Sequence, residues 1–337
     1  MKLKNTGLKV LIIRFSSMGD IIYTTPVVRC LKKQIPGIEI HFLTKKQFQF
    51  IFDGNPYLDK LHLLADKLSE TITELRNEKF DYVIDLHNSL RSTLVKLQLG
   101  VRSSTFNKMR FRKWLALRFK INKVPTSHLV DRYMDTVKFL GIQNDGDPID
   151  YFLPNTFSID HLLPESHRKG YLVFIIGAMH FTKRMPNYKV ISLCKKLSLP
   201  IVLLGGHDVQ LNGDEITSAL GSTVYNACGK LSLNESVFLV KEAQSVIGFD
   251  TGLTHIAEAF NKKIVSIWGS TSPELLGVQP YQVDQFYTAG VKLPCRPCSK
   301  FGLDHCPKKH FKCMHDIDEE QIAAFILPAT KQKIQGI

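Results

Sequence analysis

Short apolar runs alternate along the chain with longer segments in which apolar residues recur every three or four positions. The first pattern is typical of buried strands, and the second of amphipathic helices. Strands are predicted at 9–14, 39–43, 80–86, 171–177, 200–206, 245–249 and 263–268. Helices are predicted at 21–34, 68–78, 111–119, 187–197, 233–243 and 253–260. Since strands separated by helices form parallel sheets, we expect an α/β protein built from two Rossmann-like halves.

One segment, 144–169, breaks this alternation because it is rich in Asp, Pro, Ser and Gly and has few apolar runs. Such a composition is typical of a linker. A chain of 337 residues is also long enough for two domains. We therefore expect one domain over 1–155 and a second over 156–337.

The composition is that of a soluble globular protein, with 44% hydrophobic and 22% charged residues. No apolar run approaches the length of a membrane span, and the first residues lack the apolar core of a signal peptide. We therefore expect a cytoplasmic protein whose seven cysteines are reduced thiols or metal ligands.

The formal net charge of +13 is concentrated in one stretch of the chain. Between Leu86 and Val130 there is no Asp or Glu, while ten bases are present. These are Arg91, Lys96, Arg102, Lys108, Arg110, Arg112, Lys113, Arg118, Lys120 and Lys123. Such a patch predicts an anionic partner: a phosphorylated lipid, an anionic sugar or a nucleic acid. The alternative is an ordinary solvated face.

The turn after the first predicted strand, 16–20, ends in Gly19 and Asp20. Gly19 allows a tight turn and the close approach of a ligand. Asp20 can cap the helix that follows, or it can act as a general base at the tip of the strand. The turn has no G-x-G-x-x-G pattern, so nothing here indicates a nicotinamide cofactor.

A second turn, Asp250-Thr251-Gly252, follows a buried strand and opens a helix. The unpaired backbone N–H groups at a helix N-terminus favour a phosphate. His255 lies one turn into this helix, where it can reach a ligand. The alternative is a capped helix that binds no ligand.

Three further turns follow strands in the second half of the chain. Adjacent Lys183 and Arg184 suit a diphosphate, although an exposed basic loop has the same composition. Asp208 follows a Gly-Gly pair and can accept hydrogen bonds from a ribose. The turn 269–273 has small residues and a proline at a helix start. Because ligands of parallel sheets bind beyond the carboxyl ends of the strands, these turns predict a two-domain enzyme that binds a nucleoside diphosphate compound.

These motifs together resemble those of the family 9 glycosyltransferases, the ADP-heptose:lipopolysaccharide heptosyltransferases. The resemblance runs over nearly the whole chain and is carried by 10–20, by Lys183 with Pro186, by 250–255 and by 269–273. It implies a GT-B fold, in which two Rossmann-like parallel-sheet domains face a cleft. By this resemblance the first domain binds the acceptor, and the second, with its Cys-rich C-terminal segment, binds the nucleotide sugar.

The resemblance also implies a reaction, which is inverting transfer of L-glycero-D-manno-heptose from ADP-heptose to the inner core of lipopolysaccharide, with no metal required for catalysis. Asp20 is similar to the family's general base, and Lys183 would hold the leaving diphosphate. Further donor-binding residues are expected at Arg184, Asp208, Asp250, Thr251, Gly252, Leu253, Thr254 and His255. Acceptor-binding residues are expected at Ser17, Met18, Gly19, His87 and Arg91. Negative charge develops on the departing ADP, and cations or backbone dipoles must already be in place to receive it.

The resemblance gives the basic stretch a partner, because the inner core of lipopolysaccharide carries carboxylates and phosphates at a membrane face. Residues 108–120, with Phe111, Trp114 and Phe119 interleaved, can dock there. We therefore expect a cytoplasmic enzyme that is peripheral to the inner membrane and has no nucleic acid partner.

Four of the seven cysteines lie within a short segment near the C-terminus, at Cys295, Cys298, Cys306 and Cys313. Four thiols so close together can bind structural zinc. The same spacing fits plain thiols, or disulfides in an oxidising compartment. We expect that no other cofactor is required.

Three other functions fit parts of the pattern. A different GT-B sugar transferase would use another donor or acceptor. A nucleotide-sugar epimerase shares the two-domain plan but needs no lipid acceptor, so the basic aromatic stretch would have no purpose there. A nucleic-acid-binding protein would use the same bases, but the sequence shows no clear recognition helix or sheet of stacking aromatics.

Overall fold

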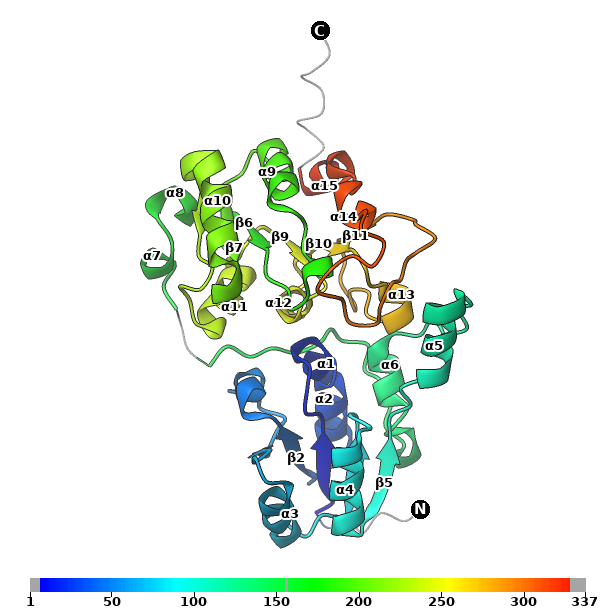
Figure 1. Cartoon of the computed structure of the whole chain (residues 1–337). Helices are drawn as coiled ribbons and strands as arrows, with labels where there is room; N and C mark the ends of the chain where they lie inside the picture. The colour runs from blue at the N-terminus through cyan, green and yellow to red at the C-terminus, as the bar shows by residue number, and fades with distance from the viewer. Residues whose placement is uncertain (1–6, 155–156, 328–337) are drawn as a thin grey trace. The chain divides into compact units, whose positions relative to one another are not determined.

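The computed structural model describes residues 7–154 and 157–327, and the chain divides into two compact units. The first unit comprises residues 1–110 and 125–154, and the second comprises residues 111–124 and 155–337. Each unit contains a parallel sheet with helices packed around it (Figure 1). The boundary expected between residues 155 and 156 lies outside the described residues.

The first unit is built on a five-stranded sheet with the order β3-β2-β1-β4-β5. Its strands are β1 (Lys9–Ile13), β2 (Glu39–Thr44), β3 (Lys60–Leu63), β4 (Tyr82–Asp85) and β5 (Arg102–Thr105). All neighbouring pairs are parallel, and Val10 of β1 lies in register with Ile40 of β2 and Tyr82 of β4. The sequence therefore predicted the three inner strands, and the edge strands β3 and β5 are additional.

Helices of the first unit bury their apolar faces against this sheet. They are α1 (Met18–Ile22), α2 (Thr25–Gln34), α3 (Leu68–Asn77), α4 (Leu90–Leu99) and α6 (Leu129–Met134). The unit also has two 3-10 helices, at Lys46–Ile51 and at Lys138–Leu140. One core cluster packs Leu11, Leu43 and Val83 of the sheet with Leu75 of α3 and Val95 of α4.

The single helix predicted over 21–34 is wrong, because the structure has two helices there, α1 and α2. Pro26 lies in the first turn of α2 and has no backbone N–H to donate to the carbonyl of Ile22. The Thr25 hydroxyl donates to that carbonyl instead, at 2.8 Å. The apolar periodicity continues across the break, so it did not reveal the interruption.

The predicted linker is only partly a linker. Its first part packs on the first unit, because the buried guanidinium of Arg29 in α2 bonds to Asp145, to the Pro148 carbonyl and to Asp150. Its last part contains two short helices, α7 (Ile159–Leu162) and α8 (Glu165–Arg168).

The second unit is built on a six-stranded sheet with the order β11-β10-β9-β6-β7-β8, again with parallel neighbours throughout. Its strands are β6 (Leu172–Ile175), β7 (Ile201–Leu204), β8 (Val224–Asn226), β9 (Ser245–Phe249), β10 (Lys263–Trp268) and β11 (Phe286–Gly290). Its helices are α5 (Arg110–Phe119), α9 (Asn187–Lys196), α10 (Gln210–Leu220), α11 (Leu233–Glu242), α12 (Gly252–Ile256), α13 (Pro273–Leu276), α14 (Lys312–His315) and α15 (Glu319–Ile326). The helix predicted over 253–260 begins at Gly252 and becomes a 3-10 helix at Ala257–Phe260.

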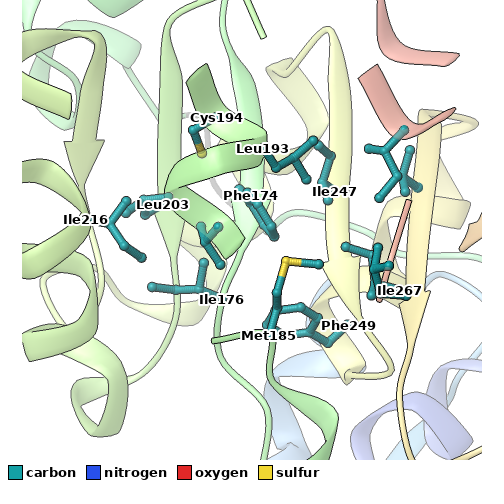
Figure 2. Packing of buried hydrophobic residues seen from close by; sticks show 14 of the residues in the cluster. Phe174, Ile176, Met185, Leu193, Cys194, Leu203, Ile216, Ile247, Phe249 and Ile267 are labelled. Atoms are coloured by element: carbon teal, nitrogen blue, oxygen red, sulfur yellow. The ribbon is translucent and has the colours of Figure 1, made fainter. Parts of the chain in front are cut away.

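The core of the second unit lies between the middle of this sheet and α9, α10 and α15. Figure 2 shows part of it, where Phe174, Ile247 and Ile267 come from three neighbouring strands and Leu193 comes from α9. All four side chains are fully buried. None of the described helices is long and apolar enough to cross a membrane.

Each sheet has a point at which the strand order reverses. In the first unit the chain winds from β1 through β2 to β3 and then continues on the other side of β1 with β4. In the second unit it winds from β6 to β8 and continues on the other side of β6 with β9. Ligands of open α/β sheets bind at this switch point, outside the carboxyl ends of the two strands. The fold therefore predicts ligand binding at the turns after β1 and β4, and at those after β6 and β9.

Candidate active site

Asp20 lies in α1, one turn after the end of β1. Its Oδ2 atom accepts hydrogen bonds from the Ser17 hydroxyl at 2.8 Å and the Ser17 backbone N–H at 3.3 Å. The Arg14 guanidinium lies 2.7 Å from the same oxygen. Within the described part of the chain, Oδ1 has no such partner, so one carboxylate oxygen is anchored and the other is available.

Arg14 fixes this carboxylate and also joins the two strands of the switch point. Its buried guanidinium donates to the Ser16 carbonyl at 2.7 Å and to the Leu86 carbonyl, directly after β4, at 2.6 Å. Burial alone would raise the pKa of Asp20, but the Arg14 charge and the bonds from Ser17 outweigh it and hold the pKa below its usual value. Asp20 is therefore ionised near neutral pH and able to accept a proton.

The turn after β4 supplies the neighbouring residues on the acceptor side. Asp85 accepts hydrogen bonds from the backbone N–H groups of His87 at 3.0 Å and Asn88 at 2.7 Å, which fixes the turn. The His87 ring packs edge-on against Phe15. Burial, followed by the Arg14 charge, lowers the pKa of His87 to about 4, so the ring is neutral at pH 7. Arg91 is exposed in the first turn of α4.

The structure thus places the predicted base Asp20 and the predicted acceptor-binding residues Ser17 and His87 at one switch point. Met18 and Gly19 form the start of α1 beside them. The Ser17 hydroxyl donates its hydrogen bond to the Asp20 carboxylate, so only its oxygen lone pairs remain for an acceptor.

Asp250 is the centre of the second set of residues. It follows β9, and its Oδ2 atom lies 2.6 Å from Lys183 Nζ, which comes from the turn after β6. The Thr271 hydroxyl, from the turn after β10, donates to the same oxygen at 3.2 Å, and His255 Nε2 of α12 lies 3.5 Å from Oδ1. Three strand ends and one helix therefore converge on a single buried carboxylate.

Two basic groups keep Asp250 ionised. Burial would raise its pKa, but His255 and Lys183 outweigh burial and lower the pKa to about 2. Asp250 therefore compensates the charge of its two basic neighbours and holds them in place.

His255 lies between two carboxylates, since its Nδ1 atom is 3.0 Å from Glu258 Oε1. Glu258 in turn accepts a hydrogen bond from the Tyr281 N–H at 2.9 Å. Burial would lower the pKa of His255, but Asp250 and Glu258 raise it to about 9. The imidazolium links the start of α12 to the chain at Tyr281.

Arg184 and Asp208 form an ion pair, and Arg184 also donates to the Ala178 carbonyl at 2.6 Å. The pair joins the turns after β6 and β7. In this arrangement Asp208 faces a guanidinium, and a ribose contact would use its remaining lone pairs.

At the start of α12, Thr251 and Gly252 are partly exposed, whereas the side chains that follow them are buried. The side chains of Leu253 and Thr254 are buried, at 8% and 1% exposure. Thr254 packs against Gly248, where a Cβ atom would lie 2.2 Å from its hydroxyl oxygen. Thr251 and Gly252 precede them with backbone N–H groups at the first turn.

Several residues that shape the two sets were not among the predicted site residues. Arg14 holds Asp20, and Thr271 and Glu258 complete the network of Asp250 and His255. The half-buried Arg296 donates to the carbonyls of Trp268 and Thr271. Arg14 and Thr271 lie within the sequence motifs, and the spacing of Glu258 three residues after His255 was also available. No sequence pattern indicated a role for Arg296.

The four clustered cysteines are free thiols. Cys298 Sγ lies 3.2 Å from the Cys295 carbonyl oxygen, and Cys295 Sγ lies 3.8 Å from His310 Nε2. Among the described residues, no three of these sulfur atoms come within 4.8 Å of one another. Structural zinc at Cys295, Cys298, Cys306 and Cys313 stays a prediction, and it requires the segment to draw together.

Comparisons with known proteins bear on the family and the fold. Residues 69–306 match the family model of glycosyltransferase family 9 (heptosyltransferase). The chain is 26% identical to lipopolysaccharide heptosyltransferase 1 of Campylobacter coli over 95% of this chain and 98% of that protein. Among solved structures, the ADP-heptose lipopolysaccharide heptosyltransferase II of Escherichia coli has a TM-score of 0.69 at 20% identity, over 95% of this chain and 97% of that one. The E. coli heptosyltransferase WaaC, solved with ADP, has a TM-score of 0.66 at 21% identity, over 95% and 99% of the two chains.

Two parallel α/β units that resemble these structures along almost their whole length define the GT-B class of glycosyltransferases. Within that class, the chain belongs to glycosyltransferase family 9, the heptosyltransferase family. The resemblance and the fold class inferred from the motifs are confirmed. As a glycosyltransferase, the protein is neither an epimerase nor a non-enzymatic binding protein.

Proposed function

We propose that this enzyme transfers L-glycero-D-manno-heptose from ADP-heptose to the inner core of lipopolysaccharide, with inversion at the anomeric carbon. Membership of the heptosyltransferase family supports the transferred sugar. The name of the Campylobacter coli relative supports the acceptor, and the E. coli relative with ADP-heptose in its name supports the donor. The observation that carries the proposal is the Asp20 carboxylate at the first switch point, with one oxygen anchored and one available.

In this mechanism Asp20 is the general base. Its Oδ1 atom takes the proton from the acceptor hydroxyl while that oxygen attacks the anomeric carbon of the donor. The bond from the anomeric carbon to the β-phosphate oxygen breaks, and its electron pair leaves with ADP. Ser17 and Arg14 hold Oδ2, so the carboxylate keeps one orientation through the step.

In the second unit, Lys183 stabilises the charge on departing ADP. Its ammonium uses N–H donors on the Asp250 carboxylate and on the Asp250 carbonyl, at 2.6 Å and 3.2 Å. An ammonium has three donors, so one remains for the diphosphate. The Arg184 guanidinium and the backbone N–H groups of Gly252 to Thr254 supply further donors, and Asp208 receives the ribose. The reaction in this form needs no metal.

The acceptor is held by the turn after β4 and by a basic surface. The neutral His87 and the exposed Arg91 suit a hydroxylated, carboxylate-bearing sugar. On α5 the side chains of Phe111, Trp114 and Phe119 are exposed, and Trp114 contacts both of the other rings. Exposed aromatics among arginines suit the anionic face of a bilayer, so we place the enzyme in the cytoplasm, peripheral to the inner membrane.

The replacement Asp20→Asn tests the proposal, because it keeps the shape of the side chain and removes its basicity. We expect heptose transfer from ADP-heptose to heptose-free lipopolysaccharide to fall by about 10²- to 10⁴-fold. The affinity for ADP should stay within about twofold of wild type, because no donor-binding residue is changed. Normal turnover by Asp20→Asn would show that another group takes the proton.

A panel of nucleoside diphosphates and nucleotide sugars separates this function from that of another GT-B transferase. Ligand binding to the native state raises the melting temperature. We expect ADP and ADP-heptose to stabilise the protein more than UDP, GDP or their sugar derivatives do. Stabilisation by a different nucleotide would identify a different donor.

A further inference from the structure

A chain of four side chains lies on the sheet face covered by α3, and none of them belongs to the candidate active site. His41 of β2 and His62 of β3 are both 1% exposed, and His41 Nδ1 lies 2.8 Å from His62 Nε2. At the outer ends, His41 Nε2 lies 2.7 Å from Glu39 Oε1, and His62 Nδ1 lies 2.5 Å from Glu74 Oε1. The order is therefore carboxylate, imidazole, imidazole, carboxylate.

The protons on two neutral rings leave the two inner nitrogens of this row of side chains without a proton between them. A carboxylate only accepts hydrogen bonds, so both outer ring nitrogens carry protons. A neutral imidazole has one proton, which leaves lone pairs on His41 Nδ1 and His62 Nε2. Two lone pairs facing each other at 2.8 Å repel, so the inner nitrogens require a cation between them. The cation is either a third proton or a metal ion.

Glu78, at the end of α3, supplies a third ligand. Its Oε2 atom lies 3.9 Å from His41 Nδ1, and among the described residues these three side chains alone place such ligand atoms within 4.8 Å of one another. Lys9 and Lys60 now contact Glu78, at 2.7 Å and 2.5 Å. Lys9 has a second carboxylate, Glu39, at 3.0 Å, so it keeps a partner when Oε2 turns to a metal.

We propose that His41, His62 and Glu78 form a binding site for a divalent transition metal ion of the zinc type. Two imidazoles and a carboxylate are a donor set that such ions prefer. The outer contacts to Glu39 and Glu74 support this assignment, because metal-binding histidines donate their second ring N–H to a carboxylate, which fixes the tautomer. Separation of the two inner nitrogens to roughly 3.3 Å would accommodate tetrahedral bonds.

The position of the site indicates a structural ion. Lys9, Glu39 and Lys60 begin β1, β2 and β3, so the cluster lies at the amino ends of the strands, whereas Asp20 follows a carboxyl end. The ion would join two strands to the end of α3. We therefore expect metal binding to raise the melting temperature of the protein without a requirement for metal during heptose transfer.

Cobalt titration of the full chain, first freed of metal by a chelator, tests the site. Co²⁺ bound by nitrogen and oxygen gives visible absorption without the sulfur-to-cobalt charge-transfer bands of cysteine ligands. We expect one equivalent of this kind, displaced by Zn²⁺, in wild type and in Cys298→Ser. His62→Gln and Glu78→Gln should bind at least tenfold more weakly, and Glu74→Gln about tenfold more weakly through loss of an outer contact. The matched control is Glu70→Gln, an exposed glutamate in the first turn of α3, which should bind like wild type.

Two results would overturn the proposal. One is wild-type protein that shows no nitrogen- and oxygen-type cobalt binding, which would assign the inner contact to a shared proton. The other is a folded Glu78→Gln or His62→Gln variant that binds with wild-type affinity. Neither result depends on heptose transfer, so the outcome is independent of the proposed function.

Discussion

Lys183 and Asp250 form a pair whose unequal surroundings suggest a division of roles. Asp250 is contacted by Lys183, Thr271 and His255 and is saturated by protein groups. The Lys183 ammonium donates to the carboxylate and the carbonyl of one residue, Asp250, which leaves its third N–H donor for a ligand. In the proposed mechanism the carboxylate therefore orients the ammonium, and the ammonium contacts the substrate.

Replacement of Lys183 tests this division. We expect Lys183→Ala to weaken ADP binding by about 10- to 100-fold, the range for a lost charged hydrogen bond, and to slow turnover as well. Calorimetric titration with ADP and steady-state kinetics measure the two effects. Lys195→Ala, at an exposed position of α9 in the same unit, makes the same change of charge and should leave both unchanged. An unaltered ADP affinity in Lys183→Ala would count against its role.

The raised pKa of His255 predicts a pH dependence of stability. Its pKa is about 9 in the folded protein against 6.5 ordinarily, so folding favours the protonated ring. This contribution is complete below pH 6.5 and is lost as the pH rises through 9. We expect the melting temperature of His255→Gln to lie well below wild type at pH 6 and to approach it by pH 9.5. A difference that stays constant over this range would show that the ring is not charged in the folded state.

The site residues that the sequence predicted share one property, which is that they lie in the connection that follows a short apolar run. Asp20, Lys183 and Asp250 follow the carboxyl ends of β1, β6 and β9, on the side where parallel sheets bind ligands. Their partners could not be derived in the same way. Arg14 bonds to a carbonyl 72 positions away, and this contact exists only because β4 is placed beside β1. The order of strands is a tertiary property that periodicity does not contain.

At the scale of elements, the inner strands and several of the longer helices were predicted, whereas the edge strands and the helices α4 and α10 were not. β5 (Arg102–Thr105) has no apolar residue, and β3 (Lys60–Leu63) has two. An edge strand has a neighbour on one side only and is less buried, so its sequence needs less apolar character. Inner strands are buried by neighbours on both sides, so the apolar runs predicted the strands at the centre of each sheet, where the switch points lie.

The helix α5 was predicted from its bases and aromatics, and its exposed rings predict binding to anionic membranes. We expect the double variant Phe111→Ser, Trp114→Ser to bind phosphatidylglycerol vesicles several-fold more weakly than wild type in co-sedimentation, because apolar contact with the bilayer is lost. Leu97→Ser, at an exposed leucine of α4, is the control and should bind like wild type. Equal binding by the double variant, or stronger retention on single-stranded nucleic acid across a salt series, would contradict the membrane assignment.

At the scale of the whole molecule, the chain has two units with separate sheets and cores. We therefore expect the nucleotide to bind to one of the two units. The residues proposed to bind the donor all lie in the second unit, after β6, β7 and β9. We expect saturating ADP to slow amide hydrogen exchange in residues 177–184, 205–208, 250–256 and 268–272, because a bound ligand stabilises the state that binds it. Exchange in residues 14–20 and 85–91, at the switch point of the first unit, should change little. Asp20→Asn should reproduce the wild-type pattern, and Lys183→Ala at the same ADP concentration should lose most of the protection. Protection centred on residues 14–20 instead would assign the nucleotide to the first unit and reverse the roles proposed for the two sheets.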